Sequence, residues 1–147
     1  MKQKNILFVC KHNIFRSKIA EAYFKKINKN KNIKLSSAGI IKGDLLNRLD
    51  KKLIKIQKET AKVFGIEIGK SSKYLSISLL GRQDIIVVVS DDVPKEIFKN
   101  KFYMKPDLKI MVWKIQDAKK GKDNRKIIKE SIRKIMKKVD RLVRKLE

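Results

Sequence analysis

The sequence predicts an α/β fold, in which a doubly wound sheet of four parallel strands is flanked by helices. Short runs of apolar, often β-branched residues alternate with longer stretches in which apolar residues recur every three or four positions. The five aliphatic residues from Ile85 to Val89 are typical of a parallel strand that is buried on both faces. No internal repeat or Pro-rich linker is visible, so we expect residues 1–147 to form a single domain.

Apolar patterning defines the elements of the first half of the chain. Asn5 to Val9 is a short continuous apolar run, which predicts the first strand. Apolar residues along one face predict a helix from Ser17 to Ile27, and Ile33 to Ala38 predicts the second strand. Helical spacing then predicts a helix from Asp50 to Phe64, and Gly65 is a natural C-terminal cap for it.

The second half continues the alternation. We expect strands at Asp84 to Val89 and at Leu108 to Trp113, and the order β-α-β-α-β-α-β-α places a further helix between them. The segment from Asn124 to Leu146 has the pattern of one long amphipathic helix. Its ten Lys or Arg residues are expected to face solvent.

The chain is strongly basic, with 39 Lys and Arg against 15 Asp and Glu and a formal net charge of +24. Such a charge attracts polyanions, which makes nucleic acid a candidate partner. However, only seven of the basic residues are Arg, the residue that nucleic-acid readers use for bidentate contacts. The lysines are also spread from Lys2 to Lys145. We therefore do not expect nucleic acid to be the primary partner.

Cysteine and histidine each occur once, as Cys10 and His12. These counts exclude an intramolecular disulfide and any Cys-rich zinc site, and they leave little for a His-based metal site, so we expect no metal. No apolar run approaches the roughly 18 residues needed to span a bilayer, and the N-terminus lacks a signal-peptide pattern. We expect a cytoplasmic protein with no membrane partner.

The segment from Cys10 to Ser17 joins the first predicted strand to the first predicted helix. Backbone N–H groups at such a junction converge with the positive end of the helix and bind an anion. A thiolate at Cys10 is stabilised there by the helix end and by Arg16, whose planar guanidinium suits two oxygens of a phosphoryl group. The Ser17 hydroxyl can donate a further hydrogen bond to the thiolate. We therefore expect a nucleophilic site for a tetrahedral oxyanion. Its expected phosphate-binding residues are Lys11, His12, Asn13, Ile14, Phe15, Arg16 and Ser17.

At these residues the sequence resembles the low-molecular-weight protein tyrosine phosphatases and the related thioredoxin-coupled arsenate reductases. The family motif is a hydrophobic strand followed by Val-Cys-x-Gly-Asn-x-Cys-Arg-Ser-Pro and a helix with Ala-Glu. The matching residues are Val9, Cys10, Asn13, Arg16, Ser17, Ala20 and Glu21. Weaker matches continue at 37–39 and 64–66. The resemblance implies a four-stranded parallel sheet, and a thiolate at Cys10 that attacks phosphorus to form a phosphocysteine.

The resemblance also implies an Asp that acts as general acid, which the family usually carries in an Asp-Pro dipeptide that this chain lacks. Asp117 is our choice, because it lies between the last predicted strand and the last predicted helix, where the family's acid is found. Asp107, before the last predicted strand, and Asp123, a candidate cap of the last helix, remain rivals. Protonation of the leaving group by a carboxyl group predicts a rate optimum below neutral pH.

Several residues depart from the family motif. His12 replaces the glycine, Phe15 replaces the second cysteine, and Lys18 replaces the proline. Lys119 and Lys120 stand where aromatic residues commonly wall the tyrosine pocket, which makes them candidates for the substrate pocket. They favour a more acidic or smaller phosphate substrate.

We therefore expect a cysteine-dependent phosphatase that hydrolyses phosphomonoesters, with protein-bound phosphotyrosine as the substrate and no cofactor. Ile14 fits the tyrosine-phosphatase form of the loop, whereas Thr is typical of the arginine-phosphatase branch. Arsenate reduction is an alternative that requires an external thiol, because Cys10 is the only cysteine. A non-catalytic protein that binds phosphate or polyanions through its basic surface is a second alternative.

Overall fold

A four-stranded parallel sheet forms the centre of the computed structural model, which describes residues 2–41, 51–99, 101–118 and 124–147. The strands are β1 (Lys4–Cys10), β2 (Ile33–Gly39), β3 (Ile85–Val89) and β4 (Lys109–Trp113). They lie in the order β2-β1-β3-β4, and every pairing is parallel. The predicted fold class is therefore confirmed.

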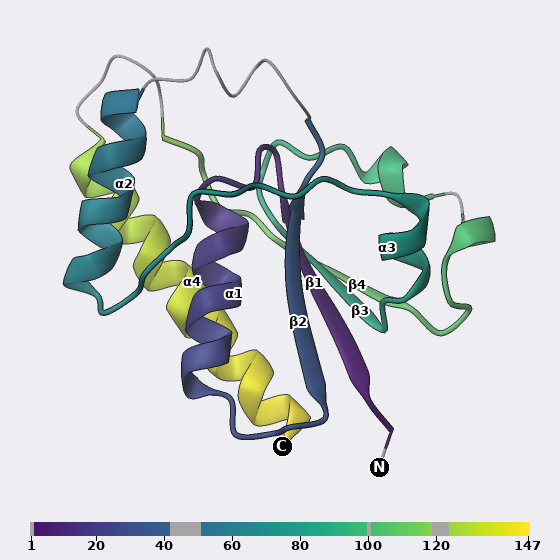
Figure 1. Ribbon diagram of the computed structural model, residues 1–147. Coiled ribbons are helices and arrows are strands. Elements are labelled where there is room, and N and C mark those ends of the chain that lie inside the picture. The colour runs from purple at the N-terminus through teal and green to yellow at the C-terminus, as the bar shows by residue number, and fades with distance from the viewer. Residues whose placement is uncertain (1, 42–50, 100, 119–123) are drawn as a thin grey trace.

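Three helices cover one face of this sheet (Figure 1). They are α1 (Arg16–Ile27), α2 (Lys51–Val63) and α4 (Arg125–Leu146). Their apolar residues pack with one set of alternate strand residues, including Phe8 and Val87, into a single hydrophobic cluster. The apolar residues of α4 that face this cluster are Ile128, Ile132, Ile135, Val139 and Leu142.

The opposite face is covered by shorter elements (Figure 1). These are α3 (Ile77–Gly81) and two 3₁₀-helices, η2 (Lys95–Phe98) and η3 (Lys101–Tyr103). Leu7, Val9 and Ile86 point to this side and pack against Phe98 and Met104 in a second cluster. The sheet is thus enclosed between two layers, which is the doubly wound arrangement.

The prediction of an α-helix between β3 and β4 is wrong. The described residues between these strands contain only the two 3₁₀-helices, in a segment bounded by Pro94 and Pro106. Proline removes a backbone donor and disfavours helical backbone in the residue before it, so the two prolines limit any helix here to the few residues between them. The short helix α3 was not predicted. It begins at Ser76, whose side chain accepts a hydrogen bond from the Leu79 N–H.

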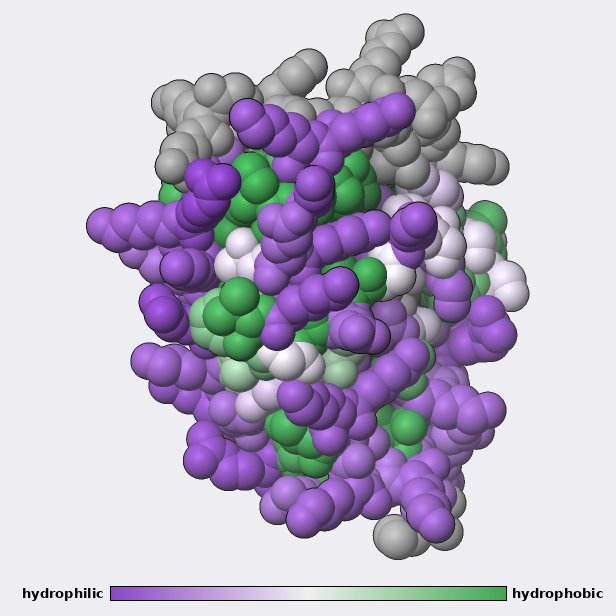
Figure 2. All heavy atoms as spheres, turned by 60° about the vertical axis from the view of Figure 1, so that its left-hand side comes forward, coloured by the Kyte–Doolittle hydropathy of each residue, from purple (hydrophilic) through white to green (hydrophobic). Residues whose placement is uncertain are grey.

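The exposed face of the helical layer is broadly hydrophilic. Figure 2 shows polar and charged side chains distributed across this face, with small apolar areas between them. The distribution agrees with the expected solvated surface of the last helix. Across the described ranges, no helix is both long and apolar enough to cross a membrane.

The carboxyl ends of β1 and β2 lie very close together. Gly39 ends β2 beside Cys10, and a Cβ atom at Gly39 would lie 2.7 Å from the backbone carbonyl carbon of His12. The Gly39 N–H donates to Lys73 O, and the Ile40 N–H donates to Cys10 O and Lys11 O. Gly39 is therefore needed for the close approach of the backbone to the β1–α1 loop.

We expect Gly39→Ala to lower the free energy of unfolding by about 1–3 kcal/mol, because the added methyl group forces backbone atoms apart. Gly69→Ala is the matched control, since a Cβ atom there meets nothing within 4 Å. Urea unfolding of the two variants measures the difference. Equal stability of the two would contradict this account of Gly39.

Candidate active site

The loop between β1 and α1 is shaped by one residue in a left-handed backbone conformation. Asn13 has φ 54°, the only positive φ among the described non-glycine residues. Asparagine tolerates this region better than most residues. Asn13 then anchors the loop. Its side-chain Oδ1 accepts from the Lys73 N–H at 2.9 Å, and its backbone carbonyl accepts from the Ser72 hydroxyl at 2.9 Å.

Cys10 lies at the end of β1 and is 2% exposed. Its Sγ is 3.0 Å from Ser17 Oγ, in the first turn of α1. Ser17 Oγ accepts from Asn13 Nδ2 at 2.7 Å, so its own hydrogen is free to point at the sulfur. Asn13 Nδ2 also donates to Ser37 Oγ, and Ser37 donates to Glu21 Oε1. A chain of hydrogen bonds therefore links the Cys10 side chain through Ser17, Asn13 and Ser37 to Glu21.

Arg16, the first residue of α1, is also 2% exposed. Its Nη1 donates to Ser90 Oγ and to the Ile115 carbonyl, both at 3.0 Å. Its Nη2 donates to Asp92 Oδ1 at 3.1 Å. A buried cation is tolerated only when its donors are satisfied, and here the ends of β3 and β4 satisfy them.

Two neighbouring aspartates face this guanidinium unequally. Asp91 approaches it at 3.6 Å, whereas Asp92 forms the shorter contact and also accepts a hydrogen bond from Ser90. Burial opposes ionisation of Asp92, but the Ser90 hydrogen bond and the Arg16 charge outweigh this and lower its pKa. Asp92 is therefore a carboxylate at neutral pH.

Asp117 lies beside Arg16. Its Oδ2 is 3.5 Å from Arg16 Nη2, and its Oδ1 accepts from the Ala118 N–H at 3.0 Å. Asp107 precedes β4 and is exposed at the opposite, amino end of the sheet, so the structure does not bring it to Cys10. Asp123, Lys119 and Lys120 lie outside the described residues. The role of Asp117 stays a prediction.

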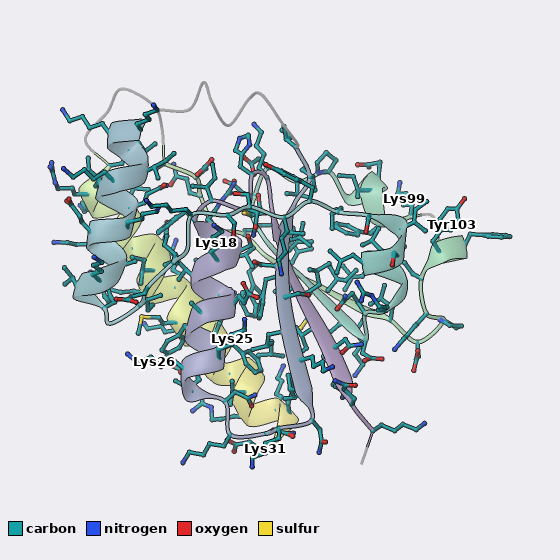
Figure 3. The ribbon with its side chains drawn as sticks, viewed as in Figure 1. Lys18, Lys25, Lys26, Lys31, Lys99 and Tyr103 are labelled. Carbon is teal, nitrogen blue, oxygen red and sulfur yellow. The ribbon has the colours of Figure 1, made fainter. Side chains whose placement is uncertain are left out.

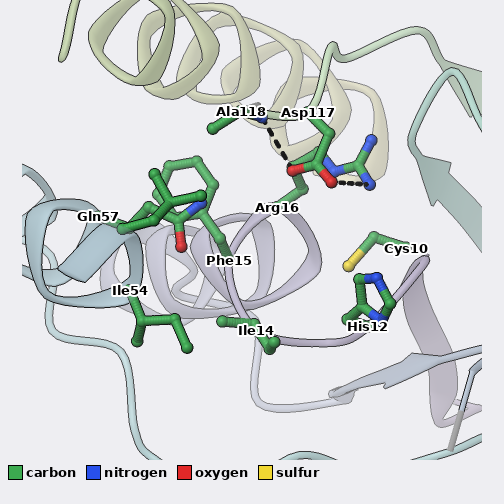
Figure 4. A pocket seen from close by; sticks show the side chains of 10 residues that line it. Cys10, His12, Ile14, Phe15, Arg16, Ile54, Gln57, Asp117 and Ala118 are labelled. Atoms are coloured by element: carbon green, nitrogen blue, oxygen red, sulfur yellow. Dashed lines mark hydrogen bonds and ion pairs between the residues drawn. The ribbon is translucent and has the colours of Figure 1, made fainter. Parts of the chain in front are cut away.

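A cavity of about 110 Å³ opens beside Cys10 and Arg16 (Figure 4). Its polar lining residues are Cys10, His12, Arg16, Gln57 and Asp117. Its apolar lining residues are Ile14, Phe15, Leu53, Ile54 and Ala118. The cavity thus brings the Cys10 thiol and the Arg16 guanidinium together with a largely apolar wall.

His12 faces this cavity as a neutral side chain. Burial, together with the charge of Lys11, lowers the pKa of the imidazole. Its Nδ1 is enclosed and has no hydrogen-bond partner within the described part of the chain.

Lys18 lies in the first turn of α1 and connects this helix to a distant segment of the chain (Figure 3). Its Nζ donates to the Gly69 carbonyl at 2.7 Å, and burial, with the charge of Lys58, lowers its pKa. The lysine that replaces the motif's proline therefore ties α1 to the segment before Ser72. Over the residues that can be described, no group of three or more His, Cys, Asp or Glu side chains is arranged to hold a metal ion.

Sequence reasoning missed several residues of the site. Ser90 and Asp92 directly follow the strongest predicted strand, a position at which parallel sheets carry functional groups, so this signal was available. Ser37 precedes the end of the second strand in the same way. Gln57 reaches the cavity only because α2 packs beside the loop, and no local sequence pattern predicts that placement.

A known protein family matches almost the whole chain. The family model described as low molecular weight phosphotyrosine protein phosphatase matches residues 5–147. No curated protein matches the chain.

Solved structures share the fold at low identity. The YwlE arginine phosphatase from Geobacillus stearothermophilus is 20% identical, with a TM-score of 0.70, over 97% of this chain and 92% of its own. A protein tyrosine phosphatase from Entamoeba histolytica is 21% identical, with a TM-score of 0.69, over 98% and 97%. A thioredoxin-dependent arsenate reductase from Corynebacterium glutamicum is 21% identical, with a TM-score of 0.65, over 99% and 64%. Together with the matched family model, the parallel sheet and the residues from Cys10 to Ser17 lead to one conclusion: the chain belongs to the low molecular weight phosphotyrosine protein phosphatase family.

Proposed function

We propose that this protein hydrolyses phosphomonoesters through a phosphocysteine at Cys10, and that its substrate is protein-bound phosphotyrosine. The observation that carries the proposal is the buried pair of Cys10 and Arg16, which opens into one cavity with Asp117. The apolar wall of that cavity suits an aryl leaving group.

In the first step, backbone N–H groups of residues 11–15 and the Arg16 guanidinium hold the phosphoryl oxygens. The Cys10 thiolate attacks phosphorus, an S–P bond forms, and the P–O bond to the leaving group breaks. Asp117, entering as a carboxylic acid, gives its proton to the departing oxygen.

In the second step, water attacks phosphorus and the S–P bond breaks. Asp117, now a carboxylate, accepts the proton from the water, so inorganic phosphate is released and the thiolate is restored. Ser17 donates a hydrogen bond to the thiolate at the start and at the end, which makes the sulfur a better leaving group. Arg16 stabilises the equatorial charge in both transition states.

We expect Cys10→Ser to lower hydrolysis of 4-nitrophenyl phosphate by about 1,000-fold or more, because a hydroxyl is a far weaker nucleophile than a thiolate. The assay contains a chelator, and circular dichroism checks that the variant is folded. Hydrolysis that survives this substitution would refute a phosphocysteine mechanism.

Asp117→Ala is expected to lower kcat for phenyl phosphate, a poor leaving group, by about 100-fold, and to lower it less for 4-nitrophenyl phosphate. The substitution should also remove the acidic rate optimum of the parent enzyme. Asp107→Ala is the matched control and should change neither substrate. An optimum above pH 8, or a larger loss in the control, would contradict the assignment of Asp117.

Asp92→Asn is expected to raise KM for 4-nitrophenyl phosphate by about 10-fold, because Arg16 loses its closest anionic partner. Asp91→Asn, at the longer contact, should have a smaller effect.

The pH dependence of stability provides a second measurement. The pKa of Asp92 is lowered in the folded protein, so its stabilisation is present at neutral pH and is lost as the pH falls through that pKa. The stability difference between the parent and Asp92→Asn should therefore shrink below about pH 4. A difference that grows in acid would contradict the pairing.

A further inference from the structure

Gln57 lies in the wall of the catalytic cavity and takes part in none of the proposed steps. It belongs to α2 and is 4% exposed. Figure 4 shows Gln57 and Ile54 on one side of the cavity, beside Phe15, with Cys10 and His12 on the other side. A group at this place would meet the part of a substrate that lies beyond the phosphorus.

The Gln57 amide has no hydrogen-bond partner among the residues that the structure describes. Thr60, one turn along α2, is paired within its own helix, because its hydroxyl donates to the Ile56 carbonyl at 2.7 Å. A carboxamide carries two donors and one acceptor that require partners, and the Gln57 amide atoms are not among the described side-chain atoms that are enclosed without one, so they stay accessible. The cavity is where this requirement is met, by water when the site is free and by a ligand when it is occupied.

Gln57 is also separate from the groups that hold the thiol and the guanidinium. Cys10 is supported through Ser17, and Arg16 through Ser90, Asp92 and the Ile115 carbonyl. No hydrogen bond joins Gln57 to this network within the described ranges. Replacement of the Gln57 side chain therefore leaves Cys10 and Arg16 in place, so its effect on substrate recognition can be measured apart from any effect on the reacting groups.

We propose that Gln57 is a specificity-determining residue, whose carboxamide hydrogen-bonds to a polar group of the substrate beyond the reacting bond. The inference rests on the proposed phosphatase activity and narrows its substrate class to phosphorylated side chains that bring such a group into the apolar pocket. The guanidinium N–H groups of phosphoarginine and the peptide groups next to a phosphotyrosine both have this chemistry. A bare aromatic ring does not, because it displaces the water and leaves the amide unpaired.

The experiment compares kcat/KM of the parent enzyme and of Gln57→Met, which keeps the length of the side chain but removes its hydrogen-bonding atoms. The substrates are phenyl phosphate, phosphoarginine and N-acetyl-phosphotyrosine amide. We expect phenyl phosphate to change less than 2-fold or to improve, and the recognised polar substrate to lose about 5- to 150-fold. Loss confined to phosphoarginine identifies the guanidinium as the recognised group, and loss confined to the phosphotyrosine amide identifies the peptide groups.

Gln83→Met is the matched control, since Gln83 is a second buried glutamine, 3% exposed, that does not line the cavity. It should not change the ranking of the three substrates. Gln57→Leu replaces Gln57→Met if the latter fails to fold. Equal losses on all three substrates, or no loss on any, would overturn the role of Gln57 while the phosphatase activity stands. A parent enzyme that hydrolyses none of the three would instead overturn the proposed function.

Discussion

Burial of the Arg16 guanidinium is the constraint on which the rest of the site depends. A cation that is 2% exposed must have its donors satisfied, and the partners come from the ends of β3 and β4. Because Arg16 is also the first residue of α1, its position fixes where the helix begins relative to the sheet. The same contacts leave the guanidinium beside Cys10 and Asp117, so one set of hydrogen bonds organises both the fold and the candidate chemistry.

The β1–α1 loop, which holds Cys10 and Arg16, is fixed by hydrogen bonds from its own side chains, although the enclosed His12 Nδ1 has no partner among the described residues. The left-handed Asn13 turns the backbone, and its amide is used on both sides, by Ser17 and Ser37 and by the Lys73 N–H. Gly39 gives the loop room at the end of β2. These features are linked, because Lys73 hydrogen-bonds through its backbone to both Asn13 and Gly39.

The sequence predicts the strands and the loop well because their signals are local. Cys10, Arg16 and Ser17 lie within eight residues of one another, at the junction of a buried strand and a helix. The partners of Arg16 could not be assigned in this way, because aspartates after strands are common. Only the assembled sheet brings Asp92 to the guanidinium. Gln57 depends on the placement of a whole helix. The prediction of a helix between β3 and β4 was wrong because the alternation of strands and helices does not hold in the segment between Pro94 and Pro106, where the described residues form only 3₁₀-helices.

The long separation of these partners in the chain bears on how the protein folds. Arg16 is 74 residues from Ser90 and 99 residues from Ile115. Their contacts close large loops, so they gain little until β1, β3 and β4 are all in register. A partly folded chain would keep the guanidinium hydrated and the anion site open. Recovery of the proposed activity during refolding would then require the completed sheet, so an assay of that activity would report on long-range tertiary structure.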